Sequence, residues 1–439
     1  MPAQASSRPA AADSGPGAGR WDAWDVGALL ALVAGGVALG LAFLHNRPDL
    51  HHGAGFLFGD QGYSLHMTDA LLDGRTLYAD IASPYGPVAA HAYAAAAALY
   101  GNSAATYNAF FLAVSALNFG LVYVLLRRHV SRPAALLTAA LGLVPSLLIP
   151  GALLGGFTSS PYVPLERTLL ILLAIFWRPP DRRTRMDAYR LGLVLGIWPG
   201  IRFGAAFFAG AAMLVADALC VASATERMGL GRWARTLGGT LLVFVLCQVA
   251  WAAHAFATLP RAVAVDVLWP YYISGSYAGW VTPDLRWPGW YGWGIFFGQY
   301  LTPAVGAVGA AWVVSRLWVR RGAPQWERGS LALLIPAFFF VLGALLFFRH
   351  VFHFHQFMWT LAVPVALLAQ QAGGRARLAL AALLVPCLAL NLKATFLNPV
   401  DAALHRVRTP AGEVLWVSPA VATGLAAVLR AAGATPPHA

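Results

Sequence analysis

The chain has 439 residues, of which 59% are hydrophobic and only 11% are charged, with a mean hydropathy of +0.63. This composition excludes a soluble globular domain and predicts a membrane protein, because apolar runs of about 17–25 residues recur, each long enough to cross a bilayer. The formal net charge of +12 comes almost wholly from arginine. The arginines cluster in short loops between apolar runs, which favours the positive-inside rule over nucleic-acid binding.

The apolar runs predict an all-α polytopic bundle of about 11–12 transmembrane helices within a transmembrane domain over 26–393. The residues before it, 1–25, are expected to form a disordered cytoplasmic tail. The tail over 394–439 is expected outside, as a strand followed by a helix. The spans are expected at about 26–44, 105–126, 133–154, 165–177, 188–199, 202–221, 237–257, 291–318, 329–348, 356–371 and 377–393.

A polar first loop over 45–87 holds five of the chain's 18 acidic residues, which are Asp49, Asp60, Asp69, Asp73 and Asp80. Within this loop, the pattern over Gln61–Leu72 predicts a short helix at the membrane interface, ended by Asp73-Gly74. The apolar segment over 88–100 is short for a crossing. If it re-enters or lies at the interface, the basic loops over 127–132 and 178–190 both fall inside, as the charge rule requires.

This topology places four segments on the outer face with the first loop. They are 155–167, the turn Pro199-Gly200-Ile201-Arg202, the aromatic loop over 258–290, and 349–355. The aromatic loop either belongs to the interfacial aromatic belt or forms a platform that stacks on sugars and lipid headgroups. The candidate platform residues, two of which come from the first loop, are Tyr63, Tyr85, Trp269, Tyr271, Tyr272 and Trp280.

Asp60 is the candidate catalytic residue, because it stands where the apolar stretch before it emerges into polar sequence. A carboxylate at a partly dehydrated boundary tends toward a raised pKa and can act as a general base. The alternative is that Asp60 caps the helix that follows it. Asp80 is a candidate second carboxylate or metal ligand, and the alternative for Asp80 is a plain turn residue.

Three arginines are candidates for binding a lipid phosphate, since the guanidinium fork suits phosphate oxygens. Arg202 lies between two short apolar segments, where an isolated arginine needs water, a carboxylate or a phosphate as its partner. It could instead reach the interface from a span end. Arg167 follows Glu166, a further candidate carboxylate, and neighbours in a helix cannot face each other, so each needs another partner. Arg349 begins a basic patch with His353 and His355.

Several motifs together resemble the first-loop region of the GT-C class of membrane glycosyltransferases. They are Gly59-Asp60-Gln61-Gly62-Tyr63, the run from Leu71 to Asp80, Pro84-Tyr85-Gly86-Pro87 and Leu99-Tyr100-Gly101. The segment Leu191–Arg202 resembles the paired short segments of that class, and Phe352–Leu368 resembles its late span. The likeness is strongest to the polyprenyl-phosphate-mannose-type and aminoarabinose-transferring enzymes, and covers most of residues 40–205.

The resemblance implies a polytopic helical enzyme of the cell membrane that takes a sugar from a polyprenyl-phosphate donor on the extracytoplasmic side. Asp60 would deprotonate the acceptor hydroxyl, and Arg202 would hold the lipid phosphate. The acceptor is a glycan, a lipid or a protein. The class commonly has an Asp-Glu pair at the first-loop site, whereas this chain has Gln61 in the second position.

Two other functions stay open from the sequence: a transporter or lipid flippase, and a non-catalytic relative of the glycosyltransferases. The sequence shows no inverted repeat and few ionisable residues inside the spans, which favours transfer over transport. No soluble-enzyme motif such as GxGxxG or HExxH is present. A divalent metal is compatible with the site but not required by it. His353 and His355 are candidate ligands, and the alternative is that they are interfacial histidines in contact with water.

Overall fold

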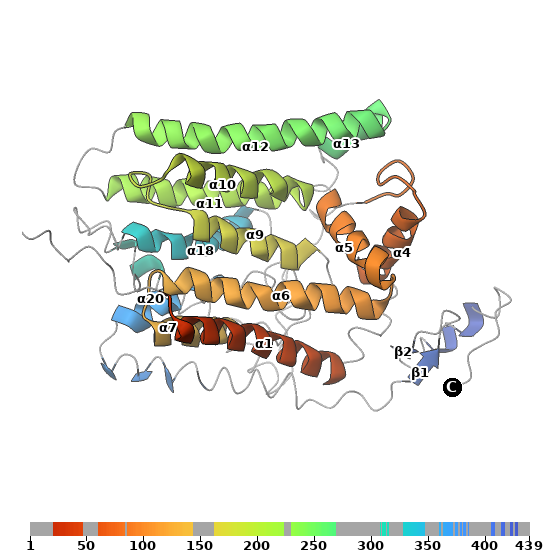
Figure 1. Ribbon diagram of the computed structural model, residues 1–439, viewed down its shortest axis with the longest axis horizontal. Coiled ribbons are helices and arrows are strands. Elements are labelled where there is room, and N and C mark those ends of the chain that lie inside the picture. The colour runs from red at the N-terminus through yellow and green to blue at the C-terminus, as the bar shows by residue number, and fades with distance from the viewer. Residues whose placement is uncertain are drawn as a thin grey trace, which may run out of the picture.

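The structure of the protein is a computed structural model. It describes residues 21–46, 60–83, 86–143, 162–223, 230–268, 328–346 and 363–371, the two strands of the tail, and short pieces within 308–315, 374–385 and 422–428. The longer helices lie side by side with nearly parallel axes (Figure 1). They are α1 (Ala23–Asn46), α6 (Ala104–Arg127), α9 (Tyr162–Phe176), α10 (Arg185–Ile197), α11 (Phe203–Ala222), α12 (Leu230–Thr258) and α18 (Ile335–Leu346).

Four helices of the described part are long and apolar enough to cross a membrane, within 23–42, 104–127, 204–222 and 231–258. The predictions of a membrane protein and of an all-α bundle are therefore confirmed for these segments. Each corresponds to an expected span, with ends displaced by one to three residues, except that the fourth begins six residues earlier than expected. Most of the spans expected at 291–318 and 377–393 lie outside the described residues.

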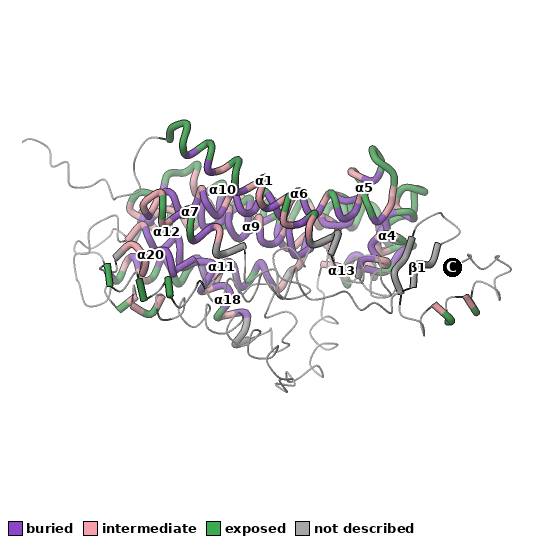
Figure 2. The backbone as a smooth tube through the Cα atoms, turned by 90° about the horizontal axis from the view of Figure 1, so that it is seen from below, coloured by how far each residue is buried: buried purple, intermediate pink, exposed green. Residues whose placement is uncertain are grey.

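The centre of the bundle is formed by α6 and α9, which Figure 2 shows as largely buried. Helix α6 packs against α1 and α9, α10 packs against α12, and α11 packs against α18. Small residues allow these close approaches. A Cβ atom on Gly192 of α10 would lie 2.4 Å from the Thr240 carbonyl oxygen of α12, and one on Gly36 of α1 would lie 2.6 Å from the Phe119 ring of α6. Such contacts suit helix packing in membranes, where tight van der Waals contact drives association.

One end of the bundle is basic, and ion pairs tie the helices together there, among them the following three groups of described residues. At the start of α1, Asp25 accepts a hydrogen bond of 2.7 Å from Arg127 Nε and one of 2.9 Å from the Tyr123 hydroxyl. The N-terminal residue of α7 (Arg132–Leu143) reaches the Asp22 carboxylate at 2.5 Å. The third group, around Asp217, is described below. The basic loops expected inside therefore meet at one end.

The opposite end carries the first loop. Helix α4 (Asp60–Leu72) agrees closely with the helix expected over Gln61–Leu72, and the chain turns after it at Gly74, whose φ of +84° is one that glycine adopts without strain. Helix α5 (Pro87–Tyr100) lies beside α4 at this end of the bundle instead of running along it (Figure 1). Helix α5 is not among the four helices of the described part that are long and apolar enough to cross a membrane, and whether it re-enters or lies at the interface stays a prediction.

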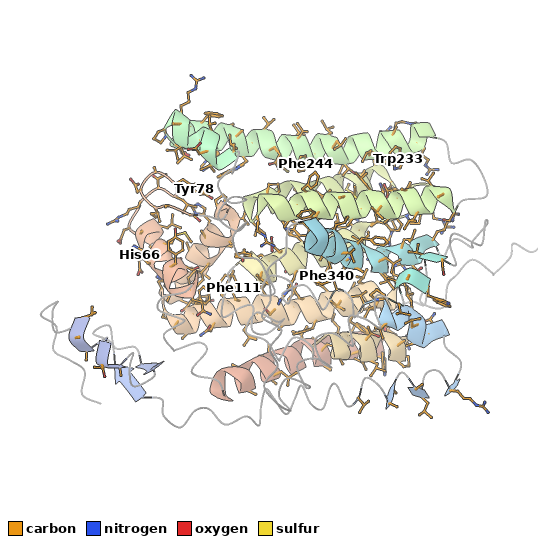
Figure 3. All side chains as sticks on the ribbon, turned by 180° about the vertical axis from the view of Figure 1, so that it is seen from behind. His66, Tyr78, Phe111, Trp233, Phe244 and Phe340 are labelled. Carbon is orange, nitrogen blue, oxygen red and sulfur yellow. The ribbon has the colours of Figure 1, made fainter. Side chains whose placement is uncertain are left out.

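The same end holds α13 (Arg261–Leu268) and a small antiparallel sheet. The sheet pairs β1 (His405–Arg408) with β2 (Val414–Val417), in the register His405 to Val417. The strand expected near 412–417 is present as β2, whereas β1 was not expected. Tyr78 packs against both the first-loop core and the α12–α13 corner. Figure 3 shows His66 and Tyr78 at this end and Trp233 at the other.

Candidate active site

Arg202 and Glu166 form a buried ion pair at the end of the bundle that carries the first loop. Arg202 Nε lies 2.9 Å from Glu166 Oε1, and the side chains are 10% and 0% exposed, respectively. The Arg202 guanidinium also lies over the Tyr162 ring, 5.1 Å from its centroid. Such a cation–π contact adds attraction where the cation is desolvated. Glu166 was expected to need a partner other than its neighbour Arg167. That partner is Arg202, which lies at the start of a different helix.

The first turn of α9 positions Glu166. Pro164 stands in this turn, where its missing N–H breaks no helical hydrogen bond. The Pro164 carbonyl accepts a hydrogen bond of 3.0 Å from the Asn118 side chain of α6 and another of 3.0 Å from the Thr168 hydroxyl. The Thr168 hydroxyl also lies 2.8 Å from Asn118 Oδ1. These polar contacts fix the start of α9 against the centre of the bundle.

The turn between α10 and α11 positions Arg202. The chain passes from α10 through the short helix η2 (Trp198–Gly200) to Arg202, which is the N-cap residue of α11 with extended backbone. Trp198 is 0% exposed, and its ring stacks on Phe339 of α18 with centroids 5.7 Å apart. With Trp198 anchored on α18 in this way, the turn presents Arg202 to Glu166.

The first loop lies directly against this turn. The Gly86 N–H donates a hydrogen bond of 2.9 Å to the Ile201 carbonyl. A Cβ atom on Gly86 would lie 2.1 Å from the Gly200 carbonyl oxygen, and one on Gly200 would lie 2.7 Å from Val88. Gly86 and Gly200 therefore pack with no room for a side chain. This contact holds the N-terminus of α5 against Ile201, which precedes Arg202.

We expect Gly86→Ala to destabilise the protein by about 1–3 kcal/mol, the usual cost of forcing an extra methyl group into a packed site. The reason is that the new Cβ meets backbone atoms of Gly200, which cannot rotate away. Thermal denaturation of the purified protein in detergent measures the effect. Gly210→Ala in α11 is the matched control, since nothing lies within 4 Å of a Cβ there. Equal midpoints for the two variants would contradict the close contact between Gly86 and Gly200.

Polar side chains hold α4 and α5 together over the site. The Asn102 amide donates hydrogen bonds of 2.8 Å to the Leu65 carbonyl and to Asp69, and its oxygen accepts one of 2.8 Å from the Tyr93 hydroxyl. Asp60 is the first residue of α4, and its side chain lies outside the described part. Gln61, which stands where the GT-C class commonly has a glutamate, is 3% exposed. The first loop therefore brings the start of α4 to the same end as Arg202.

Asp80 is engaged in its own turn. Its carboxylate accepts a hydrogen bond of 2.8 Å from the Thr76 N–H, and its own N–H donates to the Thr76 carbonyl at 2.9 Å. The residue is exposed, and Tyr78 inside the turn has a φ of +72°. Asp80 therefore has the geometry of a turn residue, which was the alternative left open from the sequence.

The other candidates are placed as follows. Tyr63 is half-buried against the core between α4 and α5, and Arg167 is 0% exposed inside the bundle. The remaining candidates, Tyr85, Trp269, Tyr271, Tyr272, Trp280, Arg349, His353 and His355, lie outside the described residues. Within the described ranges, no group of three or more His, Cys, Asp or Glu side chains could hold a metal ion. The roles of the candidate residues in this paragraph in phosphate, sugar or metal binding stay predictions.

Two residues of this site, Tyr162 and Trp198, were not expected from the sequence. Tyr162 precedes Glu166 by four residues, so the two share one face of α9, which is a signal that the helical period could have supplied. Trp198 Nε1 and Glu166 Oε2 are both buried, and neither atom makes a hydrogen bond of normal geometry in the described part of the protein. Trp198 Nε1 and Glu166 Oε2 are therefore two further polar atoms in the site that contains Arg202.

Comparison with known proteins gives matches only among solved structures. No known protein family matches the sequence, and no curated protein sequence matches it significantly. The matching solved structures include the Archaeoglobus fulgidus oligosaccharyltransferase in its apo form (14% identity, TM-score 0.46) and ArnT from Cupriavidus metallidurans bound to undecaprenyl phosphate (14%, 0.49). A third is the A. fulgidus oligosaccharyltransferase AglB in complex with an inhibitory peptide and a dolichol-phosphate (14%, 0.47).

These proteins are GT-C glycosyltransferases, the class that the first-loop motifs resemble. The matches cover 85%, 80% and 87% of this chain, respectively, and 56%, 63% and 57% of the solved chains. The chain thus spans a little over half the length of the structures it matches. The similarity is one of helical arrangement, and what this chain does depends on its own residues.

Proposed function

We propose that the protein is a membrane glycosyltransferase that moves a sugar from a polyprenyl-phosphate donor to an acceptor hydroxyl on the extracytoplasmic side of the cell membrane. The observation that supports this function best is the buried Glu166–Arg202 pair beneath the first loop. An arginine fixed at one end of a membrane bundle, beside an acidic loop, suits a ligand that combines a lipid chain with a phosphate.

In the proposed reaction, Asp60 takes the proton of the acceptor hydroxyl while its oxygen attacks the anomeric carbon of the sugar. The bond between that carbon and the phosphate oxygen breaks, and the polyprenyl phosphate leaves as an anion. Because the leaving group is already a stable anion, no general acid is needed. Arg202 offsets the charge that grows on the phosphate, in a site largely shielded from water, where such stabilisation is strongest.

Glu166 is proposed to keep Arg202 aimed at the site when no donor is bound. A buried arginine without an anion is costly, and the carboxylate at 2.9 Å supplies the counter-charge. The donor phosphate then competes with Glu166 for the Arg202 guanidinium. When the lipid phosphate leaves, the ion pair between Glu166 and Arg202 forms again. The basic end would face the cytoplasm under the positive-inside rule.

The Asp60→Asn variant is expected to abolish sugar transfer while leaving the fold and membrane insertion unchanged, since asparagine keeps the size but cannot accept the proton. Transfer would be measured with purified protein in detergent, a panel of polyprenyl-phosphate-linked monosaccharides and a cell-envelope glycolipid fraction as acceptor. Asp73→Asn, an exposed aspartate just past the end of α4, is the control and is expected to transfer normally. Full transfer by Asp60→Asn would rule out the assigned base. Lipid movement across vesicles without transfer would favour a flippase.

A further inference from the structure

The basic end of the bundle holds a group of arginines that the proposed reaction does not use. Arg128 follows α6, Arg178 follows α9, and Arg328 precedes α18. We call these three the inner arginine cluster. Arg128 and Arg178 are half-buried and the Arg328 side chain is 12% exposed, and all three residues adjoin helix ends. Cations that are only partly hydrated need counter-charges.

Contacts between neighbouring segments bring the cluster together. Arg128 Nη1 donates a hydrogen bond of 2.6 Å to the Ile175 carbonyl, three residues before Arg178. The loop that follows Arg178 carries Asp181, whose carboxylate lies 3.3 Å from Arg328 Nη1. His129 Cε1 lies 4.0 Å from the position of a Cβ atom on Gly329, the residue after Arg328. The ends of α6, α9 and the segment before α18 therefore meet around His129.

Among the described residues, the carboxylates near the cluster are already engaged by other groups. Asp217 is held by Arg183 and two tryptophans, and Asp181 is the partner of Arg328. Asp187 forms the capping box of α10 with Thr184. Among the ion pairs that the described residues make, none includes Arg128 or Arg178. Arg128 uses one N–H group to cap a helix, and the Arg178 carbonyl accepts a hydrogen bond from Arg183 within the described part of the chain.

The electrostatics of the neighbouring groups agree with an excess of positive charge. Burial, together with the charges of Arg128 and Arg178, lowers the pKa of His129 to about 3, so this imidazole stays neutral at physiological pH. Burial and the Arg178 charge also lower the pKa of Arg128, and Asp187 offsets this only in part. A further cation is not tolerated here, whereas an anion would be stabilised.

We propose that Arg128 and Arg178 bind the phosphate of an anionic phospholipid in the leaflet at the basic end of the bundle. Arg128 and Arg178 are both partly exposed, and two guanidinium groups match the oxygens of a phosphate diester. Their position at helix ends places them at headgroup depth. Basic pockets between membrane helices on the cytoplasmic side are suited to such headgroups, since that leaflet carries the anionic lipids. The ligand chemistry is a phosphate, and its source is the membrane.

Thermal denaturation of the protein in neutral detergent tests the site, with dioctanoyl phosphatidylglycerol as the probe. We expect a saturable rise in the midpoint for the wild type, and an apparent affinity about tenfold weaker for Arg178→Gln, the loss expected from one charge-assisted hydrogen bond or more. Arg185→Gln is the matched control, because it removes the same charge from an exposed position at the same end. It is expected to bind within about twofold of the wild type.

Three outcomes would overturn the proposal. Equal losses in the two variants would indicate general attraction between charges, with no site. Phosphatidylcholine as effective as phosphatidylglycerol would remove the role of net charge, and inorganic phosphate acting at the same concentration would make free phosphate the ligand. Native mass spectrometry of the wild type is a second test that needs no variant. From an equimolar mixture of phosphatidylglycerol and phosphatidylcholine, we expect the protein to retain phosphatidylglycerol preferentially. Equal retention of the two lipids would count against the site.

Discussion

Replacing Arg202 with glutamine is expected to lower the rate of sugar transfer by about 10²–10³-fold, the usual effect of removing one group that stabilises developing charge. The same change leaves Glu166, which is 0% exposed, without its cation. Breaking a buried pair from one side costs about 3–5 kcal/mol, so the variant is also expected to unfold at a lower temperature. Transfer assays and thermal denaturation of the same preparation measure the two effects together.

The double variant Glu166→Gln with Arg202→Gln separates a catalytic role from a structural one. Removing both charges avoids leaving either one buried alone, so the thermal midpoint is expected to return close to that of the wild type. Transfer is expected to stay low, because no cation remains to hold the phosphate. Recovery of both stability and transfer in the double variant would mean that the pair only supports the fold.

The sequence predicts the helices of this protein well, because each depends on local signals. Apolar runs locate α1, α6 and α12, and the short polar break around Pro199 separates α10 from α11. The glycine that ends α4 is also a local signal, since its positive φ is one that other residues rarely adopt. Helix positions therefore follow from hydropathy and from turn residues. Differences are found at α12, which begins seven residues before the expected span, and at α13, which lies in the expected aromatic loop.

The partners of the charged residues could not be predicted, because they come from distant segments. Arg202 was expected to need water, a carboxylate or a phosphate as its partner. The sequence offers several acidic residues on the same side, and only the packing of α9 beside the α10–α11 turn selects Glu166. The contact of Gly86 with Gly200 has no signal that sets these two glycines apart from the chain's 44. A charged residue in an apolar segment indicates that a partner is needed, and the tertiary packing determines which residue that partner is.

Asp217→Asn is expected to destabilise the protein by about 3–5 kcal/mol, although the residue lies at the end opposite to the proposed active site. Its carboxylate pairs with both terminal nitrogens of Arg183, at 2.9 and 2.5 Å, and both side chains are 0% exposed. It also accepts hydrogen bonds of 2.7 Å from Trp177 Nε1 and 3.2 Å from Trp233 Nε1. One carboxylate thus joins the ends of α9, α11 and α12, and an amide cannot satisfy all of these donors.

Asp187→Asn provides the matched control for this prediction. Asp187 lies on the same end of the bundle, but its carboxylate makes only surface hydrogen bonds with Thr184 at the start of α10, so its loss is expected to cost about 1 kcal/mol. Thermal denaturation of both variants in detergent measures the difference. The transfer rate of folded Asp217→Asn protein is expected to equal that of the wild type, since the group is far from Arg202 along the bundle. Equal midpoints for the two variants would show that the buried carboxylate does not hold the helix ends together.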